Sequence, residues 1–350
     1  MKSRGLPPLL AVRVDGGRRL GMGHLKKQAI LVPALKRRVK GLRVLFLVRR
    51  DAGAVRWLQA RGHTVIRMPE KLPLKKEPEW MLRHLPGERS TVMVIDILEV
   101  PADYIRKLKA SPRIKAVALF ESRGSASQAA DAAINAIVDG PAPANKRTGG
   151  GRFYGGAGYR VFHPAYKGLG RRRKRSHEAV VTFGGGEDKG LSMAAAAALA
   201  QTFPELRVTL IQGAAQAGPG RSSHRNIRIV RDAESLAPYL RRACAALTAG
   251  GGTLYELALC GVPAVAFAKV PHQRRNIRWF AESGTVADGG AFSEREIARG
   301  IVTLAGLLSD ARQFKKMAQA GRRLVDGRGT ERVLKIIQRL LEMKSKEKIK

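Results

Sequence analysis

The stretch that decides the fold is CAALTAGGGTLYELALCGVPAVAFAKVPHQRRN, residues 244–276. An apolar run at 245–248 predicts a buried parallel strand, and three glycines then lead into an apolar helix that begins at Thr253. A glycine and a proline end this helix, and a second buried strand follows at 262–270. This order of strand, turn, helix and strand is typical of an α/β protein with a parallel sheet.

The glycine turn itself, Gly250, Gly251 and Gly252, predicts a binding site for an anionic group. Glycines let a backbone approach a ligand closely, and a helix N-terminus presents unpaired N–H groups with a partial positive charge. Glu256, in the first turn of the helix, would repel a phosphate but could accept hydrogen bonds from a ribose diol. The alternative is a capping box, in which Thr253 and Glu256 satisfy each other's backbone amides.

Length and composition favour two globular domains. The chain has 350 residues and is 44% hydrophobic, enough for two α/β domains that each bury a core. No apolar run approaches the length of a membrane span. Cys244 and Cys260 are the only cysteines, both in apolar surroundings, which indicates small core residues and a cytoplasmic protein. No metal-binding spacing appears, so we expect neither a metal nor a cofactor.

The net charge of +37 would attract nucleic acid, an anionic membrane surface or a phosphorylated substrate. The basic residues are spread through nearly every predicted helix, and aromatic residues make up only 5%, too few for a base-stacking platform. We therefore interpret most of this charge as solvated surface, expect no specific nucleic acid, and keep peripheral association with an anionic membrane as an option. A charge-driven nucleic-acid-binding protein is an alternative interpretation, which predicts strongly salt-dependent binding.

The first half of the chain begins with a strand at 9–14 and a loop that contains Gly21 and Gly23. A helix begins at about His24. A glycine loop between the first strand and the first helix is where open α/β sheets bind ligands, so both glycines are candidate binding residues. The loop lacks the Lys-Ser/Thr ending of a P-loop and the usual spacing of a dinucleotide site.

Alternating strands and helices continue from there, which predicts a doubly wound parallel sheet. Asp96 lies near the C-terminal end of a strongly apolar strand. The predicted strands after the first are 42–49, 63–68, 91–98, 115–122 and 132–138, with helices around 55–60 and 102–110.

The pattern stops in a stretch rich in glycine, proline and basic residues at 140–176, where we place the domain boundary. The predicted organisation is an N-terminal domain at 1–165, a basic linker at 166–177, a C-terminal domain at 178–343 and a basic tail at 344–350. The second half repeats the layout of the first, with a glycine turn at Gly184 and Gly185 after its first strand. Two such domains would bring three glycine turns to one central cleft, a common place for ligands.

Several segments together resemble a known family. They are RVDGGRRLGMGHLKK, VMVIDIL, YGGAGYRVFHPAY, VVTFGGGEDKG and LTAGGGTLYELALCGVPAVAFAKVPHQRRN. In these segments the sequence is similar to the PseG- and SpsG-type UDP-sugar hydrolases of pseudaminic acid and spore-coat polysaccharide biosynthesis, and more distantly to the MurG-type glycosyltransferases. The resemblance implies a GT-B fold of two Rossmann-like domains.

The resemblance also implies roles for individual residues. His24 would face the anomeric carbon of a UDP-sugar, and Glu256 would hold the ribose. The turn from Gly250 to Thr253 would hold the diphosphate. The remaining implied binding residues are Gln273 and Asn276, beside the sugar or diphosphate, and Gly184 and Gly185, beside the nucleotide.

His24 carries the predicted mechanism. Its pKa near neutrality suits a general base that activates water, and a helix N-terminus would favour the neutral form that a base requires. The alternative is that His24 only caps its helix. Asp15 is the second catalytic candidate, because it could orient His24 or bind a sugar hydroxyl; its alternative is an ordinary turn-forming residue.

The sequence departs from the PseG-type pattern at three places. Ile97 stands where the family has a histidine, and Phe120-Glu121-Ser122-Arg123 replaces an Asp-Asp pair. Three glycines replace the Gly-Gly-Ser that follows the linker. The resemblance as a whole implies a UDP-sugar hydrolase acting on an amino sugar, with an inverting glycosyltransferase, which uses a hydroxyl in place of water, as the alternative.

Overall fold

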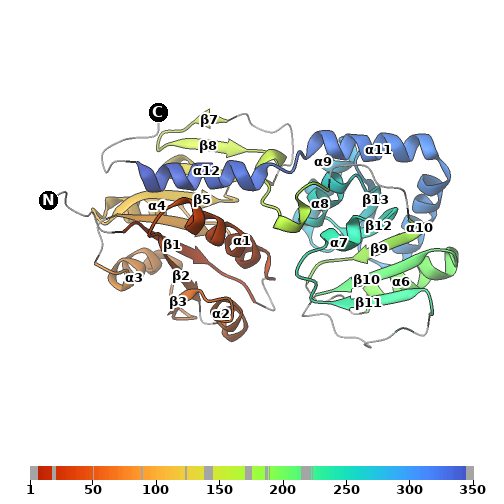
Figure 1. Cartoon of the computed structure of the whole chain (residues 1–350), viewed down its shortest axis with the longest axis horizontal. Coiled ribbons are helices and arrows are strands. Elements are labelled where there is room, and N and C mark those ends of the chain that lie inside the picture. Colours follow the sequence, from red (N-terminus) through yellow and green to blue (C-terminus); the bar gives the residue numbers. More distant parts are fainter. Residues whose placement is uncertain are drawn as a thin grey trace. The chain divides into compact units, whose positions relative to one another are not determined.

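The chain forms two compact units, each built around its own sheet (Figure 1). Unit 1 contains the described residues within 1–137, 145–161 and 328–343, and unit 2 contains those within 162–327. The computed structural model describes residues 7–17, 21–49, 51–87, 90–122, 124–137, 145–169, 176–185, 188, 190–213, 222 and 224–343.

Unit 1 contains an eight-stranded sheet in the order β3-β2-β1-β4-β5-β6-β8-β7. Its strands are parallel except for the pair β7 and β8. The strand order reverses between β1 and β4, which is the topological switch point of a doubly wound sheet. The strands are β1 (Leu9–Val14), β2 (Arg43–Arg49), β3 (Thr64–Met68), β4 (Thr91–Asp96), β5 (Ile114–Phe120), β6 (Ala132–Asn135), β7 (Lys146–Arg147) and β8 (Arg152–Gly155).

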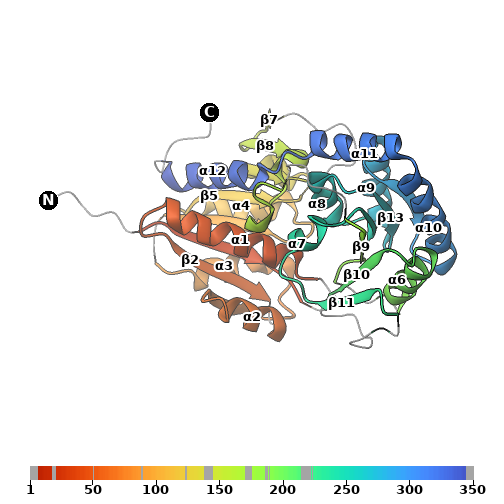
Figure 2. The same ribbon diagram turned by 45° about the vertical axis from the view of Figure 1, so that its right-hand side comes forward.

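Helices cover both faces of this sheet, because successive strand residues point to opposite sides. Val12 and Val94 pack in one core layer with α1, α2 and α12, whereas Ala11 and Ile95 pack in the other with α3, α4 and α5. Figures 1 and 2 show α1 and α12 side by side. The helices are α1 (Gly23–Arg38), α2 (Ala52–Gln59), α3 (Glu77–His84), α4 (Ala102–Ala110), α5 (Ala126–Ala129) and α12 (Gly329–Glu342), with 3₁₀ turns η1 (Leu74–Lys76) and η2 (Ala157–Tyr159).

The C-terminal helix α12 belongs to unit 1. Its residues Val333, Ile337 and Leu340 are fully buried in the core layer of α1. The sequence pattern predicts this helix as part of a C-terminal domain at 178–343, whereas in the structure it belongs to the first unit. An amphipathic pattern shows which side of a helix is buried, but it does not show which sheet buries it.

The glycine-rich segment that the sequence predicted as loop adds two short strands to unit 1. β8 pairs in parallel with β6, with Arg152 opposite Ala132. A side chain at Gly151 would place its Cβ 2.1 Å from the carbonyl oxygen of Asp131, so only glycine permits this close approach. The glycines at 150 and 151 therefore allow the backbone to come close enough for β8 to pair with β6.

The predicted domain boundary at 165 lies a few residues after the change from unit 1 to unit 2, between Val161 and Phe162. Within the predicted basic linker, residues 170–175 lie outside the described part of the chain. The predicted tail at 344–350 also lies outside it.

Unit 2 contains a six-stranded parallel sheet in the order β11-β10-β9-β12-β13-β14. The order is again that of a doubly wound sheet, and it reverses between β9 and β12. Both sheets confirm the predicted α/β class. The strands are β9 (Glu178–Thr182), β10 (Arg207–Gln212), β11 (Ile227–Arg231), β12 (Ala245–Ala249), β13 (Ala264–Ala268) and β14 (Ala287–Ala291).

The helices of unit 2 complete its core. Leu199 of α6 and Leu304 of α10 are buried together against the sheet, and Figures 1 and 2 show these two helices side by side. The helices are α6 (Leu191–Thr202), α7 (Ala237–Leu240), α8 (Thr253–Cys260), α9 (Pro271–Glu282), α10 (Glu294–Ser309) and α11 (Ala311–Leu324), with the 3₁₀ turn η3 (Pro164–Tyr166). Among the described residues, no helix combines the length and apolar character needed to cross a bilayer.

The position of α12 predicts the effect of a substitution in it. Ile337→Ala should lower the free energy of unfolding of unit 1 by about 2–5 kcal/mol, because it opens a cavity in a fully buried layer. Urea unfolding followed by circular dichroism measures this. Lys335→Ala, on the exposed side of the same helix, is the control and should change stability little. Equal effects of the two substitutions would contradict the packing of α12 described above.

Candidate active site

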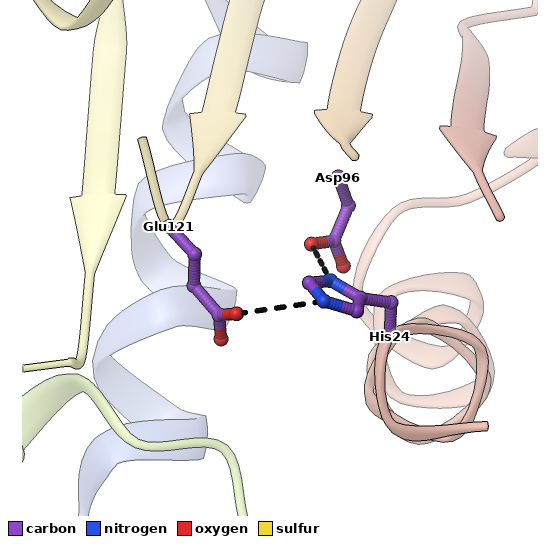
Figure 3. A group of neighbouring side chains, drawn as sticks. All are labelled: His24, Asp96 and Glu121. Carbon is purple, nitrogen blue, oxygen red and sulfur yellow. Dashed lines mark hydrogen bonds and ion pairs between the residues drawn. The ribbon is translucent and has the colours of Figure 1, made fainter. Parts of the chain in front are cut away.

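Three ionisable side chains converge at the switch point of unit 1 (Figure 3). His24 is the second residue of α1, Asp96 ends β4, and Glu121 directly follows β5. The carboxyl ends of parallel strands meet at one edge of a sheet, and open α/β sheets bind ligands there. The three residues are far apart in the sequence, and only the fold brings them together.

Asp96 fixes the orientation and the tautomer of His24. The Nδ1 of His24 lies 2.7 Å from Asp96 Oδ1, and Gln28 Nε2 donates to the other oxygen at 2.6 Å. Burial would raise the pKa of Asp96, but Lys27 and His24 outweigh it and bring this pKa to about 2. The carboxylate is therefore ionised and only accepts hydrogen bonds, so Nδ1 carries a hydrogen, and in the neutral imidazole Nε2 keeps the lone pair.

Glu121 lies on the other side of the imidazole. Its Oε2 is 3.8 Å from His24 Nε2, and its Oε1 accepts a hydrogen bond of 2.7 Å from Lys27 Nζ. Lys27 Nζ also lies 3.0 Å from Asp96 Oδ1. Burial is the largest single effect and would raise the pKa of Glu121, but the charges of Lys27, His24 and Arg160 together lower this pKa. Both carboxylates are therefore ionised beside one histidine.

The electrostatics of His24 differ from the sequence prediction. We expected the helix N-terminus to favour the neutral imidazole. Burial does lower the pKa of His24, but the hydrogen bond and charge of Asp96, with help from Glu121, outweigh it, so the pKa is raised. The alternative role as a helix cap is also wrong, because the N-cap of α1 is Met22 and the His24 side chain turns to Asp96.

Among the described residues, one group of histidine and acidic side chains could hold a metal ion. It consists of His24, Asp96 and Glu121. Their ligand atoms lie within 4.8 Å of one another. The sequence analysis expected no metal, because spacing along the chain does not reveal such a group. The ammonium of Lys27 already lies against both carboxylates, and a divalent cation there would meet its positive charge. The arrangement therefore favours proton transfer over metal binding.

Asp15 does not contact His24. Arg13 donates to both oxygens of Asp15, at 2.6 and 2.7 Å, and the backbone N–H of Arg49 donates to one of them at 3.1 Å. The orienting role considered for Asp15 is therefore filled by Asp96. The Asp15 side chain is 18% exposed, so binding of a sugar hydroxyl stays a prediction.

A buried ionic network holds Asp15 in place. Arg13 and Glu77 are both fully buried, and Arg13 Nε donates to Glu77 at 2.9 Å. Glu77 also accepts from Arg49 at 2.6 Å and from the hydroxyl of Tyr104 at 2.9 Å. The sequence analysis missed Glu77 because it did not predict helix α3, which contains it. A charged residue on a short helix gives no sequence signal that it is buried.

The glycines of the first loop, Gly21 and Gly23, have open space around them. A Cβ built on either would meet no atom within 4 Å, and Gly21 has a φ of +77°. Residues 18–20 of this loop lie outside the described part of the chain. A role of both glycines in substrate binding stays a prediction.

The switch point of unit 2 carries the predicted glycine turns. Gly184 and Gly185 follow β9, and the turn that begins at Gly250 joins β12 to α8, as the sequence indicated. Gly252 is the N-cap of α8, so Thr253 lies one position too late to be the N-cap of a capping box. Binding of an anionic group is the prediction that remains for this turn.

Two polar residues of α9 lie beside the Gly250 turn, and one of them is hydrogen-bonded to it. Asn276 Nδ2 donates to the carbonyl of Gly250 at 2.7 Å, and Gln273 Oε1 accepts from the backbone N–H of Lys269 at 2.9 Å. A Cβ at Gly250 would come within 2.6 Å of Ile277, so the glycine is needed for packing as well. The buried Oδ1 of Asn276 has no hydrogen-bond partner among the described residues. A Cβ built on Gly251 would have its nearest neighbour 3.9 Å away, so there is open space at this glycine. The binding roles of Gly250, Gly251, Gln273 and Asn276 stay predictions.

Glu256 lies close to the side chains of Tyr166 and Cys260. Burial is the main cause that raises the pKa of Tyr166, and the negative charge of Glu256 is the second. The same two causes raise the pKa of Cys260 to about 12. The carboxylate thus lies near the end of η3, and its role toward a ribose stays a prediction.

Comparisons with known proteins agree with this architecture. No protein-family profile matches the chain. It is 28% identical over 346 residues to the spore coat polysaccharide biosynthesis protein SpsG of Bacillus subtilis (strain 168). The alignment covers 95% of this chain and 98% of that protein. This similarity confirms the resemblance inferred from the sequence segments.

Solved structures confirm the GT-B fold. MurG from Acinetobacter baumannii superposes with a TM-score of 0.66 at 15% identity, covering 95% of this chain and 100% of MurG. UGT2 of Phytolacca americana, solved with UDP-2-fluoro-glucose and pterostilbene, superposes with a TM-score of 0.60 at 12% identity, covering 95% of this chain and 99% of UGT2.

The buried network around Arg13 gives a second prediction. Glu77→Ala should lower the free energy of unfolding by about 3–5 kcal/mol, because it leaves a buried guanidinium without a main counter-charge. Glu79→Ala on the same helix removes an exposed ion pair with Lys107 and should cost less than about 1 kcal/mol. Urea unfolding measures the free energy of unfolding of both variants. Similar losses of stability in the two would contradict the claim that burial makes the pair of Arg13 and Glu77 important.

Proposed function

We propose that this protein hydrolyses a UDP-linked amino sugar at its anomeric carbon, releasing UDP and the free sugar. The reaction would belong to the biosynthesis of a surface polysaccharide or a nonulosonic acid. The similarity to SpsG and the GT-B fold support the broader part of this proposal, a nucleotide-sugar enzyme of polysaccharide biosynthesis.

One observation carries the hydrolytic part. In its neutral form His24 has a lone pair on Nε2 at the switch-point edge of unit 1, and a buried, ionised Asp96 holds the opposite nitrogen at 2.7 Å. This is the arrangement of a general base whose conjugate acid is stabilised by a carboxylate. The base takes a proton from water as the water oxygen attacks the anomeric carbon, and the bond to the diphosphate breaks with its electron pair on the UDP oxygen.

The glycine turn of unit 2 supplies the other requirement, a place for the diphosphate. Gly250, Gly251 and Gly252 precede the N-terminus of α8, where unpaired N–H groups favour an anion. Backbone amides and basic side chains can stabilise a leaving diphosphate without a metal ion. We assign Thr253 to the same subsite.

The alternative is an inverting glycosyltransferase, in which an acceptor hydroxyl replaces water. The structure of UGT2 with both a UDP-sugar analogue and pterostilbene shows that this fold accommodates an acceptor in that protein. UDP release that depends on an added acceptor would select this alternative, whereas release in buffer alone supports hydrolysis.

Replacement of the base predicts a loss of turnover. His24→Ala should reduce UDP release from a panel of UDP-sugars by roughly 10²–10⁴-fold, the usual contribution of a general base. His84→Ala, an exposed histidine of the same unit, is the control and should leave the rate unchanged. Unchanged turnover in His24→Ala would remove His24 from the mechanism.

The pKa of His24 predicts a pH profile. The base must be unprotonated, and its pKa is raised above 6.5, so kcat/KM should fall as the pH falls through a value above 6.5. The groups that set this value are Asp96 and Glu121, which raise the pKa, and Lys27, which lowers it. Rates of UDP release between pH 5 and 9 measure the profile. An acid limb at or below the ordinary histidine value would contradict the assignment of the base.

A further inference from the structure

Two hydrogen-bond acceptors face each other across the site, and no described residue donates a hydrogen bond to either of them. In the neutral imidazole, Nε2 of His24 carries a lone pair, because the hydrogen is on Nδ1. Oε2 of Glu121 lies 3.8 Å away, beyond the range of a direct hydrogen bond. The hydrogen bond from Lys27 goes to Oε1, so Oε2 is the oxygen that faces the histidine (Figure 3).

The backbone holds Glu121 in this position at an energetic cost. Its φ is +53°, in the left-handed region that side-chain-bearing residues rarely adopt. Its N–H donates to the carbonyl of Ile134 on the neighbouring strand β6 at 2.9 Å, which fixes the conformation. Strained residues that the surrounding structure maintains are frequent at functional sites.

The spacing of the two acceptors indicates what fits between them. The distance of 3.8 Å is less than two hydrogen-bond lengths, so one small molecule can donate to both atoms. Water has two O–H groups and satisfies both acceptors. An alcohol has a single O–H and leaves either Nε2 or Oε2 without a donor, which is unfavourable in a site that is mostly buried. The pair therefore favours a nucleophile with two donors.

We propose that Glu121 is a second catalytic residue, which with His24 Nε2 holds the attacking water by both of its hydrogens and so selects water over a hydroxyl acceptor. This inference rests on the proposed function and specifies its nucleophile. In the step, the O–H that points to Nε2 gives its proton to His24, and the new C–O bond forms at the anomeric carbon. The bond to the diphosphate breaks, UDP leaves with the electron pair, and the hydrogen that points to Glu121 stays on the sugar as its new hydroxyl.

The test measures how the protein divides a UDP-sugar between two nucleophiles. The full chain is incubated with the UDP-sugar that it turns over fastest, in buffer with and without methanol, and free sugar and methyl glycoside are quantified separately. Glu121→Ala removes the acceptor of the second water hydrogen and leaves Nε2 available. Hydrolysis should fall about 10- to 100-fold, the effect of one charge-assisted hydrogen bond. Methanolysis, which needs only Nε2, should change less than about threefold, within the range of a weak surface contact.

A second variant keeps the size of the side chain. In Glu121→Gln, Lys27 requires the amide oxygen, so the amide NH₂ takes the place of Oε2 and donates to Nε2. The base is then occupied, and hydrolysis and methanolysis should fall together. Glu99→Gln is the matched control, since Glu99 is also a glutamate with positive φ (45°) but is exposed, and both rates should stay at the wild-type values.

The outcomes separate this inference from the proposed function. The role of Glu121 would be overturned if the wild type hydrolyses the UDP-sugar and Glu121→Ala gives the same ratio of methyl glycoside to free sugar. That result would leave the proposed function intact. Absence of UDP release from every UDP-sugar in the panel would overturn the proposed function and this inference with it. A higher ratio of methyl glycoside to free sugar in Glu121→Ala supports both.

Discussion

One buried ammonium group makes the charged cluster of unit 1 possible. Lys27 Nζ lies 3.0 Å from Asp96 and 2.7 Å from Glu121. Two carboxylates this close to one imidazole would otherwise repel each other, and one of them would take up a proton. With the ammonium between them both stay ionised, so one carboxylate holds Nδ1 of His24 while the other faces Nε2. The charge balance of the whole site depends on this side chain.

The fold supplies these groups through two simple regularities. Helix α1 presents His24, Lys27 and Gln28 on one side, because residues three and four apart are neighbours on a helix surface. The carboxylates come from the ends of β4 and β5, which are adjacent strands in the sheet. A helix and two strand ends therefore assemble a five-residue network without any long loop. Burial then strengthens every charge interaction within it.

The two units use the same strand order for different chemistry. At the switch point of unit 1 the chain places charged side chains that can move a proton. At the switch point of unit 2 it places glycines and a helix N-terminus, which suit the binding of an anion. In unit 1, the buried ion pair of Arg13 and Glu77 holds Asp15 in place. In unit 2, the hydrogen bond from Asn276 to the carbonyl of Gly250 stabilises the glycine turn. The proposed function requires both features, an anion site in one unit and a proton-accepting group in the other.

The sequence by itself determined the fold class, the two doubly wound sheets, the glycine turns and His24 at the start of its helix. Apolar runs and glycines act locally, and their spacing is read directly from the chain. Only the tertiary structure decided that Asp96 rather than Asp15 orients His24, that Glu121 faces Nε2, and that α12 packs on the first sheet. These depend on contacts between residues 72 to almost 300 positions apart, and on the carboxylates of Asp96 and Glu121, which raise the pKa of His24 although burial and the helix terminus favour its neutral form. Charge and burial depend on three-dimensional neighbours, which a linear pattern does not contain.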